Sequence, residues 1–202
     1  MIRISERLAE PRVAEARLVL PFDLRSRSRF RAQLDTGEEV GVTLTRGFIL
    51  RGGEELAGPV EGAFGVAPPT RPLASVSEGP RAALWLGPDE WLLIAEDEPE
   101  GLYEKLEAAL AGVFHALIDV SHRQTGLEIA GPGAERLLAA GVPLDLDLSA
   151  FPVGMVTRTL LLKAEITLWR REAERFRLEV GRSFAPYVAA ALTQSSRDQE
   201  GG

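Results

Sequence analysis

The stretch ALWLGPDEWLLI, residues 83–94, contains two apolar runs on either side of a turn. The runs, 83–86 and 91–94, have the length and the aromatic and aliphatic content of β-strands. Gly87, Pro88 and Asp89 between them are residue types that tight turns favour. The stretch therefore predicts two neighbouring antiparallel strands, and the patterns on either side of it decide the fold class.

Helical and strand patterns alternate downstream of this hairpin. Residues 99–113 predict an amphipathic helix, because Leu102, Leu106, Leu110 and Val113 fall on one face. Further strands are predicted over 116–120, 126–130, 155–162, 165–170 and 176–180, and further helices over 134–140 and 183–192. The resulting order, ββαββαβββα, predicts an α+β fold with helices packed on antiparallel sheet.

Residues 1–61 predict a small antiparallel β domain instead. Strand alternation covers 15–22 and 24–34, and the turn 35–38 leads to a return strand through Val40, Val42 and Leu44. Arg46-Gly47 and Gly52-Gly53 predict two more turns. The predicted organisation is a β domain over 1–61, a linker or the start of a second domain over 62–79 (with a short helix as an option over 60–66), an α+β domain over 80–195 and a flexible tail over 196–202.

Charge and composition exclude several classes of function. Residues 1–61 hold ten Arg and ten acidic residues, so the net charge of −7 lies in the remainder of the chain. An acidic body lacks the basic surface that a general nucleic-acid binder needs. The chain has no cysteine, which excludes disulfides and thiolate metal sites. It has no apolar run of about 18 residues and no signal-peptide pattern, so we expect no membrane span and a cytoplasmic location.

Two motifs contain residue types that carry chemistry elsewhere, and both have simpler interpretations. Asp119-Val120-Ser121-His122-Arg123 holds the letters of a hydrolase triad, but triad members come from separated positions, and Ser121 and His122 would point to opposite faces of a strand. We interpret this motif as a strand end that enters a turn. Gly131-Pro132-Gly133 lacks the rest of a phosphate-binding series, and we interpret it as a turn that starts a helix.

The acidic, aromatic and basic clusters also have simpler, structural interpretations. Asp145 and Asp147, with Glu165 and Glu179, could hold a hard cation, but a solvated loop is the simpler interpretation. We expect core or subunit-interface positions for Trp85, Trp91 and Trp169. Alternation over 24–34 predicts a solvated strand face for four arginines, Arg25, Arg27, Arg29 and Arg31. We therefore predict no catalytic, cofactor-binding or metal-binding residue in this chain.

The first 58 residues resemble a known family. The residues that carry the resemblance are Leu18-Val19-Leu20-Pro21-Phe22-Asp23, Asp35-x-Gly37, Leu44-x-Arg46-Gly47 and Leu50-Arg51-Gly52-Gly53. They are similar to the N-terminal domain of UreE, the nickel chaperone of urease assembly. The resemblance implies a domain that binds protein partners, such as urease apoprotein or maturation factors. Nickel in that family is held by a second, histidine-bearing domain, and His115 and His122 match no such motif, so nickel delivery is not implied.

Residues 63–192 resemble another family. The matching residues are those of the 84–92 stretch, then Asp119-Val120-Ser121, Gly131-Pro132-x-Ala134, Gly141-x-Pro143-Leu144-Asp145-Leu146, Trp169-Arg170 and Arg182-Ser183-Phe184-Ala185-x-Tyr187. They are similar to the sarcosine oxidase gamma subunit, part of a heterotetrameric flavoenzyme that oxidatively demethylates sarcosine. The resemblance implies a non-catalytic structural partner of the alpha and beta subunits, with the folate-binding fold of aminomethyltransferases. It assigns flavins, NAD and folate to the larger subunits.

The two resemblances together predict a fusion or chimera. The UreE-like sequence stands where gamma subunits carry an additional N-terminal strand and helix. A natural fusion, a gene-model error and an engineered chimera would each produce this sequence. If the missing segment supplies a strand, we expect an unpaired edge and lowered stability, with 15–22 as a substitute strand. The leading functional expectation is a structural subunit of the flavoenzyme. The alternatives are a urease-assembly module and a folate-binding module.

Overall fold

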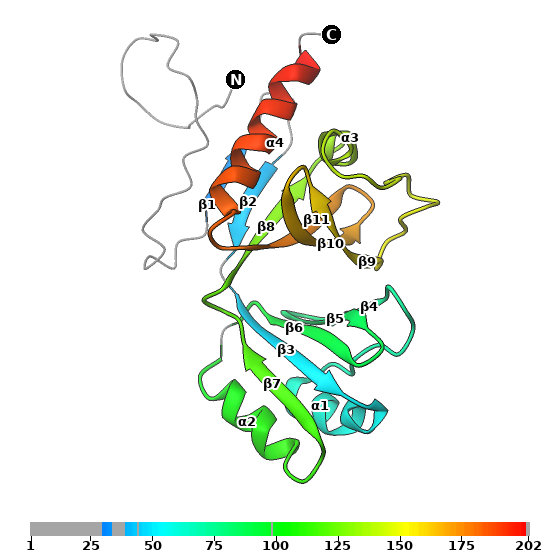
Figure 1. Ribbon diagram of the computed structural model, residues 1–202, viewed down its shortest axis with the longest axis vertical. Helices are drawn as coiled ribbons and strands as arrows, with labels where there is room; N and C mark the ends of the chain where they lie inside the picture. The colour runs from blue at the N-terminus through cyan, green and yellow to red at the C-terminus, as the bar shows by residue number, and fades with distance from the viewer. Residues whose placement is uncertain (1–29, 34–38, 44, 98, 201–202) are drawn as a thin grey trace.

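The computed structural model describes residues 30–33, 39–43, 45–97 and 99–200. They form two antiparallel sheets, each with helices on one face (Figure 1), so the predicted α+β class is confirmed. In chain order the elements are β1 (Phe30–Gln33), β2 (Glu39–Thr43), β3 (Arg46–Gly52), a 3-10 helix (Glu54–Leu56), α1 (Ala57–Phe64), β4 (Ser75–Glu78), β5 (Arg81–Gly87), β6 (Glu90–Ala95), α2 (Leu102–Ala109), β7 (His115–Asp119), β8 (Gln124–Ala130), α3 (Ala134–Ala139), β9 (Val156–Leu161), β10 (Ala164–Glu172), β11 (Arg175–Gly181) and α4 (Ala185–Glu200).

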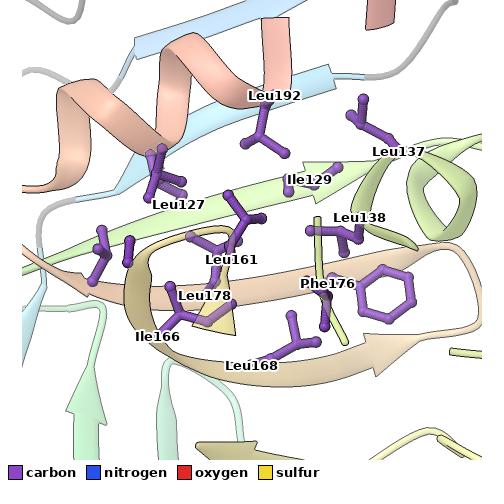
Figure 2. Close-up of a cluster of buried hydrophobic side chains, with 14 of the residues drawn as sticks. Leu127, Ile129, Leu137, Leu138, Leu161, Ile166, Leu168, Phe176, Leu178 and Leu192 are labelled. Carbon is purple, nitrogen blue, oxygen red and sulfur yellow. The ribbon is translucent and has the colours of Figure 1, made fainter. Parts of the chain in front are cut away.

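The six-stranded sheet has the order β1-β2-β8-β11-β10-β9 and carries α3 and α4. Apolar residues alternate along its central strands, so one face of the sheet is apolar. Figure 2 shows the cluster that this face forms with the helices, including Leu127 and Ile129 of β8, Leu178 of β11 and Leu192 of α4. These side chains are almost completely buried, and the cluster is the larger of the two helix-covered cores.

The five-stranded sheet has the order β4-β5-β6-β3-β7 and carries α1 and α2. Leu102 and Leu106 are buried on α2 at the four-residue spacing that the sequence indicates, and they pack with Phe48 and Leu50 of β3. A third apolar cluster lies between the two sheets, where Leu92 and Ile94 of β6 pack with Trp169 of β10 and neighbouring residues. The sheets therefore face each other through their inner faces and carry their helices outside.

A short backbone ladder joins one edge of each sheet. Ala74, just before β4, pairs with Met155, just before β9. The Ser75 N–H donates to the Gly154 carbonyl at 2.9 Å, and the Val156 N–H donates to the Leu73 carbonyl at 2.8 Å. None of the helices in the described part of the chain has the length and apolarity that a membrane crossing needs.

The predicted order ββαββαβββα is observed from β5 to α4. Three details differ from the sequence prediction. Ser75–Glu78 forms β4 inside the segment predicted as a linker, α1 begins at Ala57 rather than at residue 60, and α4 continues past Leu192 to Glu200. Each of these three segments has too few apolar residues to show a clear sequence pattern. The pairing of β4 with β5 and the packing of the two helices determine their structure instead.

The strands of the UreE-like segment belong to both sheets. β1 and β2 form the predicted antiparallel pair, and β2 also pairs with β8. The predicted turn at Arg46-Gly47 is wrong, because both residues lie in β3, between β6 and β7. β3 thus occupies a central place in the five-stranded sheet. The predicted strand 15–22 and turn 35–38 lie outside the described residues, as do Arg25, Arg27 and Arg29.

Candidate functional site

The inner face of the six-stranded sheet carries mostly polar and charged residues, apart from Val156 and Trp169 of the apolar cluster between the sheets. Strand alternation sends one set of side chains to the helices and the other set toward the second sheet. The strand registers across β9, β10, β11 and β8 align three rows of residues on this inner face: Val156, Trp169, Arg177 and Glu128; Arg158, Thr167, Glu179 and Gly126; and Leu160, Glu165, Gly181 and Gln124.

The first row is covered by the five-stranded sheet, and its Arg177 is the centre of a buried ion-pair network. The Arg177 side chain is 1% exposed and donates to Glu179 Oε1 at 2.7 Å, Glu96 Oε1 at 2.9 Å and Thr45 Oγ1 at 3.0 Å. Arg171 donates to the same Glu96 oxygen at 2.8 Å. A buried guanidinium is tolerated only when such partners compensate its lost hydration. Because Glu96 follows β6 and Thr45 precedes β3, the network ties the two sheets together.

Gly126 makes room for this guanidinium. A Cβ atom at Gly126 would lie 2.5 Å from Arg177 Nη2 and 3.0 Å from Glu179 Oε1. Real Cβ atoms do not approach other atoms that closely, so a side chain here would displace the ion pair.

The second and third rows, except Gly126, form the floor of an open cleft of about 1160 Å³ between the two sheets. Ile49, Glu90 and Val120 form the opposite wall. Arg158 donates to Glu90 across the cleft, so the two walls are linked at one side. Two large apolar side chains remain open to solvent in the cleft, because Leu160 is 42% exposed and Phe184 is 49% exposed.

The polar groups of the cleft suit binding better than catalysis. Among the described residues, neither Arg123 nor Lys163 has an ion-pair or hydrogen-bond partner for its side chain. The Thr167 and Ser183 hydroxyls and the Gln124 amide likewise have no partner in the described ranges. No lining hydroxyl in this part of the chain is hydrogen-bonded to a histidine or carboxylate that could activate it as a nucleophile.

The residues of the apparent hydrolase triad are not arranged as one. The Gly47 N–H of β3 donates to Ser121 Oγ at 3.1 Å, and the Ser121 N–H donates to Asp119 Oδ1 at 2.8 Å. His122 is exposed in the turn between β7 and β8. The interpretation as a strand end that enters a turn therefore agrees with the geometry. The serine joins this turn to β3.

The glycine and aspartate motifs also take their structural interpretations. The Ala134 N–H donates to the Gly131 carbonyl at 3.0 Å, and α3 begins there. Asp147 Oδ1 accepts from the Ser149 hydroxyl at 2.5 Å and from the Ser149 N–H at 2.8 Å, and these hydrogen bonds lower the pKa of Asp147. Glu165 and Glu179 lie in the cleft instead. In the described ranges, no three His, Cys, Asp or Glu side chains gather where a metal ion could bind.

The aromatic residues and His115 have structural partners. Trp91 is 3% exposed and donates from Nε1 to the Pro69 carbonyl at 2.8 Å, and Trp169 is equally buried between the sheets. Trp85 packs at the edge of the core beneath α1 and α2. His115 Nδ1 lies 2.8 Å from the Val113 carbonyl, and its Nε2 lies 3.5 Å from Glu107 Oε2.

Sequence reasoning missed the cleft and its lining. Arg123, Lys163 and Phe184 lie at turns or at a helix start, where no periodic pattern singles them out. A signal did exist in β11, where Arg175, Arg177 and Glu179 alternate with apolar residues. That alternation indicates a charged inner face, but only the register of four strands shows that the face is partly covered and partly open.

Two family models match overlapping parts of the chain. The model described as "Sarcosine oxidase, gamma subunit family" matches residues 52–198, and the model described as "UreE urease accessory protein, N-terminal domain" matches residues 3–59. Both resemblances that the sequence suggested are therefore confirmed. The two matches overlap over residues 52–59, from the last residue of β3 through the 3-10 helix to the start of α1.

Individual relatives show the same division. A sarcosine oxidase gamma subunit of Arthrobacter sp is 43% identical over 98 residues, which are 48% of this chain and 47% of the relative. A urease accessory protein UreE of Alkalilimnicola ehrlichii is 56% identical over 54 residues, which are 27% of this chain and 33% of the relative. The chain thus spans about half of the gamma relative and a third of the UreE relative.

Solved structures match both sheets together. A chain of the heterotetrameric sarcosine oxidase from Corynebacterium sp. U-96, solved in complex with pyrrole 2-carboxylate, is 28% identical with a TM-score of 0.73; the match covers 79% of this chain and 85% of that one. The glycine cleavage system aminomethyltransferase T from Bartonella henselae matches at 18% identity with a TM-score of 0.58, covering 76% of this chain and 44% of that one. This second likeness concerns the fold alone, and it agrees with the predicted aminomethyltransferase-like architecture.

Proposed function

Since this chain belongs to the sarcosine oxidase gamma subunit family, we propose that it is a non-catalytic, structural subunit of a heterotetrameric flavoenzyme that oxidises sarcosine. The observation that carries the proposal is the match of both sheets to a chain of such a heterotetramer. β3 belongs to one of these sheets, although the whole strand lies within the residues that match the UreE model.

In this proposal the chain contributes shape and contact surface, and the chemistry belongs to its partners. We assign the flavins, NAD and folate to the alpha and beta subunits, as the family resemblance implies. The cleft supports a binding role, since it offers exposed apolar and charged groups. The cytoplasm is the compartment that we propose for the complex.

Coexpression tests the proposed role. The chain is produced with the alpha and beta subunits of the Corynebacterium enzyme, and the gamma subunit of that enzyme serves as the positive control. We expect the chain to elute from a sizing column in one peak with flavin absorbance. A soluble, folded chain that elutes apart from the flavin-containing subunits would contradict the proposal.

A second candidate function rests on the UreE-like segment. Its identity to UreE favours a role in which residues 3–59 contact urease apoprotein or a maturation factor, without nickel. The position of β3 argues against it, because Phe48 and Leu50 are 0% exposed within the five-stranded sheet. Capture of urease apoprotein by the chain, reversed by a free UreE N-terminal domain, would support this candidate over the first.

Folate binding is the weakest of the three candidates. It rests only on a fold shared with an aminomethyltransferase, and a fold does not determine a ligand. Titration of the chain with tetrahydrofolate, followed by tryptophan fluorescence, tests it directly. Trp169 packs in the same cluster as Val120, a lining residue, so its fluorescence is expected to respond to a ligand in the cleft.

A further inference from the structure

We infer that the cleft between the two sheets binds an extended segment of a partner subunit, one that carries an aromatic or aliphatic side chain beside acidic groups. The inference rests on the proposed function, because it names the surface through which the subunit would join its complex. It goes beyond that function by assigning a site and the chemistry of its occupant.

The apolar part of the argument concerns side chains that the fold leaves uncovered. Phe184 precedes α4 and is 49% exposed, while Leu160 of β9 is 42% exposed. Both line the cleft, and Ile49 and Val120 face them from the opposite wall. Isolated exposed apolar residues need no explanation, but apolar residues on both walls of one concave site are typical of pockets that receive an anchoring side chain.

The electrostatic part concerns cations that the chain itself does not neutralise. Arg158 is paired with Glu90, and Glu179 is paired with Arg177, so these four charges are compensated. Arg123 and Lys163 have no ion-pair partner in the described part of the chain. The lining as a whole is balanced, with Arg123, Arg158 and Lys163 against Glu90, Glu165 and Glu179. Glu165 is the one lining carboxylate without a pair in the same ranges, so the unpaired charges are two cations and one carboxylate. An acidic segment complements the two unpaired cations, although the chain as a whole carries −7.

The start of α4 adds to the positive potential at this side of the cleft. Ser183 and Phe184 line the cleft, and the helix begins at Ala185. A helix N-terminus carries partial positive charge, so it acts with Arg123 and Lys163 rather than against them.

The size of the cleft favours a polypeptide over a small molecule. Its volume of about 1160 Å³ exceeds the range of about 300–1,000 Å³ that small-molecule sites occupy. The floor also permits close approach of a backbone, because a Cβ atom at Gly181 would meet only the Phe184 ring, at 4.0 Å. Thr167 and Gln124 beside it supply a hydroxyl and an amide that can bond to the peptide groups of an extended segment.

Charge reversal in the full complex tests the inference. The double variant Arg123→Glu/Lys163→Glu is compared with Arg71→Glu/Lys105→Glu, which makes the same charge change at two exposed positions outside the cleft. Affinity for the coexpressed alpha and beta subunits is measured by sedimentation, after thermal melting shows that each variant folds. We expect the cleft variant to bind about tenfold more weakly or worse, with the control close to the unaltered chain.

Photocrosslinking identifies the occupant. A benzoylphenylalanine is placed at position 184, or at position 114 as the control, since Phe114 is 91% exposed and lies outside the cleft. We expect position 184 to crosslink to an acidic, apolar segment of one partner subunit. Equal affinity of the two double variants, or no crosslink from position 184 to a subunit in the assembled complex, would overturn the inference and would leave a small molecule as the candidate ligand. Failure of the unaltered chain to join the complex would instead contradict the proposed function.

Discussion

β3 and the β1–β2 hairpin come from the same UreE-like segment, but they hold different places in the fold. β3 lies between β6 and β7, and two of its side chains, Phe48 and Leu50, are completely buried. β2 pairs with β8, while β1 pairs only with β2 and forms the edge of its sheet in the described part of the chain. One strand of the segment is thus embedded in the gamma-like body, and the hairpin extends a sheet of that body at its edge.

Strand pairing, and not the origin of a sequence, therefore decides what a fused segment contributes to the fold. The expected unpaired edge in the gamma-like body does not appear between β6 and β7, because β3 fills that position. Its alternation fits both sides, since Phe48 and Leu50 meet α1 and α2 while Ile49 faces the other sheet. The UreE-like sequence therefore acts in part as a structural element of the gamma fold.

The largest effect should come from removing β3. We expect a chain that begins at residue 45 to retain a folded five-stranded sheet, and a chain that begins at residue 53 not to fold. Loss of buried Phe48 and Leu50 alone costs several kcal/mol each, against a total stability of about 5–15 kcal/mol. Circular dichroism and thermal melting measure the outcome. Cooperative melting of the shorter chain would show that β3 is dispensable, and that the embedded strand matters no more to folding than the edge hairpin.

The next largest effect should come from Arg177, which holds the crossover between β2 and β3 through Thr45. Arg177→Met leaves Glu179, which is 6% exposed, without its ion-pair partner, and removal of one member of a buried pair costs about 3–5 kcal/mol. Arg175→Met on the same strand is the matched control, because Arg175 is 42% exposed, and about 0–1 kcal/mol is expected. Urea unfolding compares the two. Equal losses would mean that the buried network does not join the UreE-like crossover to the sheets.

The sequence predicts the gamma-like part of the fold better than the join. The order of elements from β5 to α4 follows from strong local patterns such as the 84–92 stretch and the leucines of α2. β3 was missed because Arg46-Gly47 and Gly52-Gly53 resemble turns, and only the partners on both sides make the segment a strand. The cleft could not be predicted, because its lining comes from residues between 49 and 184 that the fold alone brings together.

Substitutions at two glycines are expected to have smaller effects of opposite sign. Gly126→Ala places a Cβ atom 2.5 Å from Arg177 Nη2. We expect this overpacking to lower the free energy of unfolding by about 1–3 kcal/mol. Gly62→Ala on α1 is the control, since a Cβ atom there meets nothing within 4 Å. That substitution should stabilise the chain by about 0.4–1 kcal/mol, because alanine has less freedom to lose in a helix. Urea midpoints measure both. A neutral Gly126→Ala would show that the Arg177 network can shift without cost.

The smallest effect is expected for an ion pair within the gamma-like sequence alone. Arg81 of β5 donates to both oxygens of Asp97, at 2.7 and 2.8 Å, and these hydrogen bonds lower the pKa of Asp97 from its usual 3.8. A carboxylate whose pKa is lower in the folded state than in the unfolded state stabilises the fold at pH values above its unfolded-state pKa. That stabilisation is lost as the pH falls through the folded-state pKa. The carboxylate is 36% exposed, so solvent screening limits the gain to about 1 kcal/mol or less. The difference in urea midpoint between the unaltered chain and Asp97→Asn should therefore be small at pH 7 and fall further in high salt. It should disappear as the pH falls below 3.8 and through the lowered folded-state pKa. If Asp97→Asn lowers stability at pH 7 as much as Arg177→Met does, exposed ion pairs stabilise the chain as strongly as the buried network. The embedded crossover would then contribute no more to stability than the rest of the gamma-like body.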